Sequence, residues 1–228
     1  MTDYIVAKYF RHPSYWCIDG SPYFSIYELN HLIDGLGGVD QTQQALDSFR
    51  RKTRSAGFPE LHLNAVAWGI RIPPREQRIR GVPHLLAKLG FSSATSYVWI
   101  HHVELPEFPV TSYEYAAVKA AAYWRSSANE FGVPCHPNVT MGWDSSPRTC
   151  QSDVFSNVGY PFTPILGGNT PGAFQGALRE AKQFLDETPQ QPKILNINAW
   201  NEWTEGSYLE PDNRYGMAYL EAIGKIFL

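Results

Sequence analysis

Carboxylates, amides and indole rings crowd one stretch near the end of this 228-residue chain, residues 198–210. Glu202 and Glu205 stand three positions apart, and Trp200 and Trp203 stand among them. Carboxylates transfer protons to and from sugar oxygens, and aromatic rings cover the C–H faces of a pyranose. These residue types in one short stretch favour chemistry on a carbohydrate.

A structural interpretation of the same stretch places Trp200 and Trp203 in the core and both glutamates on a solvated face. Strand alternation cannot bury the rings and expose both acids, because Glu, Trp and Glu follow within four positions. Gly206, directly after Glu205, indicates a backbone position that tolerates no side chain. We therefore favour a functional loop, and the structural interpretation stays as the alternative.

Hydrophobic period and turn residues predict the elements that position this stretch. Residues 193–197 form a short buried strand that leads into it, and residues 211–213 close it as a turn. Four earlier strands are predicted at residues 23–27, 61–68, 94–99 and 138–143, the first of them buried on both faces. Helices are predicted over residues 40–56 with Asp40 as N-cap, and over 83–89, 112–131, 174–185 and 215–226, with a glycine loop at 35–38.

Strands that alternate with helices indicate a parallel α/β sheet with right-handed crossovers. In a (β/α) barrel of the TIM type, the C-terminal ends of the strands carry the active site. Five strand–helix units do not close an eight-fold barrel, so we expect a partial, open barrel whose first strand is an uncovered edge, in one domain over residues 1–228. Polar residues fall at or just past the predicted strand ends: Glu28, Asn64, His101, His102, Asp144, Glu202 and Glu205.

Composition excludes several other classes of function. The net charge is −3, from 19 basic and 22 acidic residues without a basic patch, so no nucleic-acid partner is expected. No apolar run is long enough to span a bilayer. Three cysteines without metal spacing predict free thiols in a reducing, cytoplasmic compartment. Adjacent His101 and His102 point apart on an extended chain, so no metal and no other cofactor is expected, and the basic run 75–80 reads as a solvated loop.

The acidic stretch also carries a resemblance. Residues 198–206, Asn-Ala-Trp-Asn-Glu-Trp-Thr-Glu-Gly, with 208–212 and 215–216, resemble the glycoside hydrolase family 99-like domain, and more narrowly the WbsX-type proteins of bacterial polysaccharide loci. Residues 9–13, 18–20, 23–27, 142–144 and 147–148 resemble the same group. The resemblance implies a (β/α)8 barrel whose first three strand–helix units have no counterpart here, so those missing units are an expected partner.

The resemblance implies a reaction and its residues. It is retaining endo-cleavage of an α-mannoside through a 1,2-anhydro sugar, on an oligosaccharide or polysaccharide substrate. Glu202 would be the base that deprotonates the sugar 2-hydroxyl, and Glu205 the acid/base at the leaving oxygen. The expected substrate-binding residues are Trp143, Asp144, Trp200, Asn201, Trp203, Tyr208, Glu210, Asn64 and His101.

Two other classes stay open beside the hydrolase. WbsX-type proteins are often labelled glycosyltransferases, and the sequence leaves hydrolysis and transfer unresolved. A transferase that uses a nucleotide sugar would usually carry Asp-x-Asp with a divalent metal, and this motif is absent from the sequence. The third alternative is a degenerate, non-catalytic sugar-binding barrel that keeps the rings.

Overall fold

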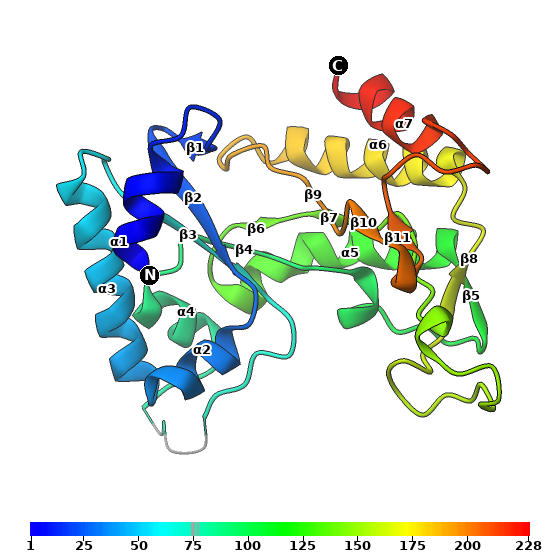
Figure 1. Ribbon diagram of the computed structural model, residues 1–228, viewed down its shortest axis with the longest axis horizontal. Coiled ribbons are helices and arrows are strands. Elements are labelled where there is room, and N and C mark those ends of the chain that lie inside the picture. The colour runs from blue at the N-terminus through cyan, green and yellow to red at the C-terminus, as the bar shows by residue number, and fades with distance from the viewer. Residues whose placement is uncertain (74–75, 77) are drawn as a thin grey trace. The chain divides into compact units, whose positions relative to one another are not determined.

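The computed structural model describes residues 1–73, 76 and 78–228, so part of the predicted basic loop lies outside the described residues. The fold is mixed α/β (Figure 1). The chain divides into two compact units. Unit 1 comprises Met1–Thr95 and Ser126–Cys135, and unit 2 comprises Ser96–Arg125 and His136–Leu228.

Unit 1 is built on a sheet with strand order β1-β2-β3-β4-β6. Its strands β2 (Ser21–Ile26), β3 (His62–Val66) and β4 (Ser93–Thr95) pair in parallel, in sequence order. The parallel arrangement predicted for the first three strands is therefore confirmed. The third strand is shorter than predicted: it ends at Thr95, and a 3₁₀ helix, η2 (Trp99–His101), begins at the last residue of the predicted range.

The expected uncovered edge at the first predicted strand is wrong. Strand β1 (Cys17–Ile18) folds back on β2 as an antiparallel hairpin and covers that edge. The first strand is also not buried on both faces, since only Pro22 of β2 is buried. A hairpin partner protects the backbone groups of an edge strand from other chains, which explains why a short β1 is enough.

Helices α3 (Val39–Ser55) and α4 (Val82–Leu89) confirm the two predictions in this unit. The predicted N-cap of α3 is wrong, because Gly38, with a φ of 129°, occupies that position. Asp40 lies instead in the first turn, where a carboxylate is favoured by the helix dipole, and it forms an ion pair with Lys88 at 2.5 Å.

Unit 1 also contains shorter helical segments. Helix α1 (Thr2–Tyr4) runs into a π-helical segment, η1 (Ile5–Phe10), at the start of the chain. Helix α2 (Leu29–Leu36) occupies half of the predicted glycine loop, because Leu29 and Ile33 bury one of its faces. The helix ends at Gly37, whose φ of 91° is left-handed, as helix C-termini often are.

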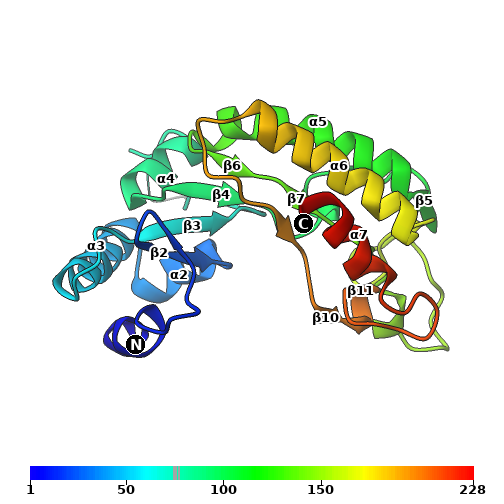
Figure 2. The same ribbon diagram turned by 90° about the horizontal axis from the view of Figure 1, so that it is seen from above.

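Unit 2 packs helices against irregular but buried segments. Its helices are α5 (Tyr113–Phe131), whose last residues belong to unit 1, with α6 (Pro171–Glu187) and α7 (Ala218–Phe227). Figure 2 shows α6 running beside α5 and α7. The core includes the fully buried side chains of Trp99, Met141 and Phe174. All three helices confirm their predicted positions to within a few residues at each end.

The predicted fourth strand, residues 138–143, is a strand only at its first two residues, and Pro137 separates it from a preceding strand that was not predicted. Strand β6 (Cys135–His136) belongs to the sheet of unit 1, whereas β7 (Asn138–Val139) pairs in parallel with β9 (Asn196–Ile197). Proline has no N–H for a strand ladder, and the carbonyl of Pro137 accepts a hydrogen bond from the amide of Asn196. A second parallel pair, β5 (Val110–Ser112) with β8 (Ile165–Gly167), was not predicted.

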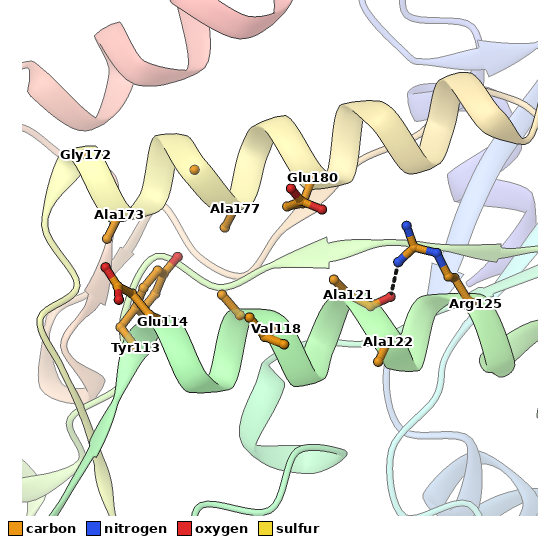
Figure 3. Close-up of a pocket in the computed structure, with 12 residues that line it drawn as sticks. Tyr113, Glu114, Val118, Ala121, Ala122, Arg125, Gly172, Ala173, Ala177 and Glu180 are labelled. Carbon is orange, nitrogen blue, oxygen red and sulfur yellow. Dashed lines mark hydrogen bonds between the residues drawn. The ribbon is translucent and has the colours of Figure 1, made fainter.

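Small side chains line an open groove between α5 and α6 (Figure 3). Ala173 and Ala177 of α6 face Val118 and Ala121 of α5, and Arg125 donates to the carbonyl of Ala121 at 3.1 Å. None of the candidate site residues lines this groove. Within the described residues, no helix is both long enough and apolar enough to cross a bilayer.

Candidate active site

The stretch 198–210 folds as a small hairpin. Strand β10 (Asn201–Glu202) pairs with β11 (Ser207–Tyr208), and the 3₁₀ turn η4 (Trp203–Glu205) lies between them. Side chains three residues apart lie on the same side of a 3₁₀ helix. Glu202, the N-cap residue of η4, is therefore brought to the same side as Glu205.

Neighbouring segments hold this hairpin in place. Asn198 accepts from the amide of Met141 at 3.3 Å and donates to the hydroxyl of Ser207. Ser207 in turn donates to the carbonyl of Gly142 at 2.8 Å. These polar groups satisfy one another's hydrogen bonds, and Ser207 is fully buried, so Asn198 anchors the loop. Asp212 closes the following turn by accepting from the amide of Arg214 at 2.9 Å.

Gly206 confirms the prediction of a position that tolerates no side chain. Its φ is 58°, and a Cβ placed there would lie 2.8 Å from the Cβ of Asp144. The amide of Asp144 donates to the carbonyl of Glu205 at 2.6 Å. The close approach of these two backbones joins the two acidic stretches that the sequence analysis singled out.

The two glutamates have unlike surroundings. Glu205 is buried, with 9% of its surface exposed, and it accepts from Tyr160 at 3.0 Å on Oε1 and from Tyr97 at 3.4 Å on Oε2. Glu202 is more exposed and accepts from Thr204 at 3.2 Å on Oε1. Burial, followed by the hydrogen bond to Glu205, raises the pKa of Tyr160, so this phenol keeps its proton near neutral pH.

One guanidinium nitrogen contacts both acids. Arg148 Nη2 lies 2.6 Å from Oε1 of Glu202 and 3.5 Å from Oε1 of Glu205. The sum of these distances is an upper limit for the separation of the two oxygens. Both acids can therefore reach one glycosidic bond.

Aromatic rings form an exposed platform beside the acids. Trp203 stacks on Tyr208 with ring centroids 3.7 Å apart, and its Nε1 donates to Glu210 at 2.6 Å. Trp203 is 43% exposed and Trp200 is 52% exposed. Partial burial, and then the hydrogen bond to Asp212, raise the pKa of Tyr208. Rings held in this way offer apolar faces to a sugar.

Trp143 and Asp144 occupy a cavity wall behind the hairpin. Trp143 is only 3% exposed and donates from Nε1 to Thr163 at 3.0 Å, so most of its ring belongs to the core. The cavity measures about 350 Å³ and adjoins Gly206 and Tyr208. The remaining side chains on its wall include Asn169, Thr170, Arg214, Tyr215 and Tyr219.

Three other predicted binding residues, Asn64, Asn201 and His101, lie in three different elements of the fold. Asn64 lies in unit 1, fully buried, and its amide is hydrogen-bonded to Ser25 at 3.0 Å and to Ser93 at 2.9 Å. These bonds make Asn64 a tie between three strands. Asn201 is exposed in β10, and His101 lies in η2 with its ring 5.9 Å from that of Tyr97. Burial lowers the pKa of His101 to about 4.

Four residues that were not predicted for the site contact the two acids: Arg148, Tyr160, Tyr97 and Thr204. Arg148 stood in the resembling segment 147–148 without a role. Nothing in the local pattern marks Tyr160 or Tyr97, because tertiary folding alone brings these tyrosines to Glu205. In the described part of the chain, no three His, Cys, Asp or Glu side chains gather in a way that could hold a metal ion.

Paired carboxylates next to exposed rings on an α/β scaffold are features of carbohydrate-active proteins. The chain matches the family described as "Glycosyltransferase WbsX" over residues 2–223 and belongs to that family. It is 27% identical over 225 residues to an uncharacterized protein WxcX of Xanthomonas campestris pv. campestris strain B100, and 28% identical over 234 residues to the WxcX of strain ATCC 33913. These matches cover 95% of this chain but 28% of each relative. No solved structure matches the chain.

Proposed function

We propose that this chain carries a sugar-transferring active site in which Glu202 and Glu205 cleave a glycosidic bond with retention of configuration. The observation that carries the proposal is the contact of both carboxylates with one nitrogen of Arg148. The family description favours transfer to a sugar hydroxyl. Hydrolysis, which the resemblance to family 99 favours, shares the first half of this reaction and uses water as the acceptor.

In the first half of the reaction, Glu202 removes the proton of the donor's 2-hydroxyl. The freed O2 attacks C1, the bond from C1 to the leaving oxygen breaks, and Glu205 gives its proton to that oxygen. The products are a 1,2-anhydro sugar, a protonated Glu202 and an ionised Glu205. Glu205, which has this role, is the more buried of the two acids and is contacted by the hydroxyl groups of Tyr160 and Tyr97.

In the second half of the reaction, Glu205 removes a proton from the acceptor hydroxyl and Glu202 returns its proton to O2. The acceptor oxygen bonds to C1 as the C1–O2 bond breaks, so two inversions give net retention. The exposed rings of Trp200 and Trp203 would hold donor or acceptor sugars. The acceptor bound at these rings decides the reaction. A bound sugar gives transfer, and water gives hydrolysis.

The proposal also includes a barrel fold, a single domain, a role in polysaccharide synthesis and a cytoplasmic location. Parallel order in β2, β3 and β4, with α3 and α4 in the crossovers, supports a portion of a (β/α) barrel. The single domain over residues 1–228, a role in polysaccharide synthesis and a cytoplasmic location stay predictions. The relatives are longer, so the activity of the whole protein is part of this proposal.

The test is a time course with an aryl α-mannobioside as donor, with and without mannose as acceptor. We expect aryl alcohol release, an α-configured first product by ¹H NMR, and a transfer product when mannose is present. Glu202→Gln should abolish all three signals. A β-configured first product, or an unaffected Glu202→Gln variant, would contradict the proposal. Sugar binding without turnover in the unmodified chain would favour the non-catalytic alternative.

A further inference from the structure

Arg148 is an exposed residue whose backbone is fixed by hydrogen bonds of its own turn and of the residues before it. It ends a 3₁₀ turn, η3 (Ser146–Arg148), and its amide donates to the carbonyl of Ser145 at 3.0 Å. The hydroxyl of Ser145, a fully buried residue, donates to the carbonyl of Pro161 at 2.5 Å. The amide of Ser146 donates to Asp144 at 2.9 Å. The backbone is therefore fixed at the residues that lead into Arg148.

Arg148 and Tyr160, at the two ends of the loop 148–160, both contact the acids. The guanidinium carbon of Arg148 lies 6.0 Å from the ring centre of Tyr160, within the range of a cation–π contact. Tyr160 donates to the same oxygen of Glu205 that lies 3.5 Å from Arg148. A cation and a phenol from one loop thus contact the glutamates in a defined geometry.

The contacts on Glu202 also distinguish its two oxygens. Arg148 and Thr204 both donate to Oε1. Among the described residues no donor contacts Oε2, so this oxygen is the one that can accept a proton from a substrate. Since the donors sit on one oxygen, they turn the carboxylate as well as stabilise its charge.

We propose that Arg148 is a positioning residue, which holds Glu202 ionised with Oε2 directed at the substrate and so decides which acid carries the proton. This inference rests on the proposed function. Two carboxylates at one site disfavour double ionisation, and a cation stabilises the nearer of them more, because Coulomb energy falls with distance. Arg148 lies 2.6 Å from Glu202 and 3.5 Å from Glu205, so its charge acts more strongly on Glu202 than on Glu205.

The direct test is a ¹³C NMR titration of glutamate carboxyl carbons. Glu202 is assigned by the signal that Glu202→Gln removes. We expect Arg148→Gln to move the titration midpoint of Glu202 to higher pH and Arg148→Lys to move it less, because lysine keeps the charge but loses the planar fork. Arg179→Gln, at an exposed position on α6, is the matched control and should leave the midpoint unchanged. An equal midpoint in the unmodified chain and in Arg148→Gln overturns the inference, whether or not the chain has activity.

Kinetics with the aryl α-mannobioside separate this inference from the proposed function. We expect Arg148→Gln to lose roughly 10²-fold in kcat, with a small change in KM, and to shift the acidic limb of its pH profile to higher pH. A general loss of structure would not move that limb, and thermal unfolding by circular dichroism checks the fold of each variant. An inactive unmodified chain refutes the proposed function, while the titration still decides the role of Arg148. An active chain with an unaltered Arg148→Gln variant refutes the inference and leaves the function standing.

Discussion

At the scale of single residues, Glu202 and Glu205 differ in the donors that reach them. Glu205 accepts from two phenols, and Glu202 from a guanidinium and an alcohol. Phenols can exchange roles with a protonated carboxyl group, because a hydroxyl donates and accepts. A guanidinium only donates, so it suits a carboxylate that stays ionised. The difference between donors predicts different responses of the two acids to substitution.

The response should depend on the leaving group. Replacing either acid by Gln keeps volume but removes proton transfer, which is worth about 10²–10⁴-fold for each group. An activated aryl leaving group needs no proton, so it should restore much of the first step in Glu205→Gln but not in Glu202→Gln. Burst-phase release of the aryl alcohol measures that step. Equal restoration in both variants would mean that the two roles are shared, and restoration in Glu202→Gln alone would mean that they are reversed.

Gly206 gives a prediction about stability. Gly206→Ala places a Cβ 2.8 Å from the Cβ of Asp144 at a left-handed backbone position, and such strain costs of order 1–3 kcal/mol. We expect a lower midpoint of thermal unfolding. Gly176→Ala is the matched control, because that helical position is open to within 4 Å and alanine favours a helix by roughly 1 kcal/mol. Equal stability of both variants would show that the hairpin can move away from Asp144.

At the scale of elements, the sequence predicts the helices that have a clear hydrophobic period. It does not predict short elements whose form depends on tertiary contacts. The long helices α3, α5 and α6 carry enough apolar positions to be found. The β10–β11 hairpin is two residues deep on each side, too short for a pattern, and its form depends on Asn198 and Ser207. Pro137 precedes the predicted fourth strand, and the short strands on either side of it, β6 and β7, belong to different sheets. In the site, the acids follow from residue type, whereas Tyr97 and Tyr160 reach Glu205 only through the fold.

The η2 segment predicts how stability depends on pH. Burial, and to a lesser extent His101, lower the pKa of His102 from 6.5 to about 4. The unfolded chain therefore binds this proton before the folded chain does, so stability is lost as the pH falls from about 6.5 to about 4. His102→Phe keeps the stacking on Tyr123, whose ring centre lies 4.2 Å away, and should reduce this loss by up to about 3 kcal/mol.

Urea unfolding at several pH values measures the effect of His102→Phe. The control is His31→Gln, since the side chain of His31 is 80% exposed and its removal should leave the pH dependence nearly unchanged. An unaltered slope between pH 6.5 and 4 in His102→Phe would show that His102 is not the group that titrates. The prediction concerns stability alone and is independent of any activity.

At the scale of the whole molecule, neither unit is a continuous piece of chain. The boundaries fall at residues 95–96, 125–126 and 135–136. The second of these boundaries lies inside α5, which runs without interruption from Tyr113 to Phe131. Helix formation is cooperative along its length. A helix shared by both units therefore couples their unfolding through the backbone itself.

This coupling predicts that a substitution in one unit destabilises both. Ala120 is fully buried in α5 within unit 2, and Ala120→Gly should cost about 1 kcal/mol in helix propensity with roughly 0.8 kcal/mol for the lost methyl group. Native-state hydrogen exchange measures the stability of each unit separately, from the protection of the amides of β3 in unit 1 and of β9 in unit 2. We expect the slowest amides of both strands to lose protection by the same factor. The reciprocal variant is Ala45→Gly in α3 of unit 1, which should also lower protection in β9. Lost protection confined to the substituted unit in both variants would show that the units unfold independently and that α5 breaks near Arg125.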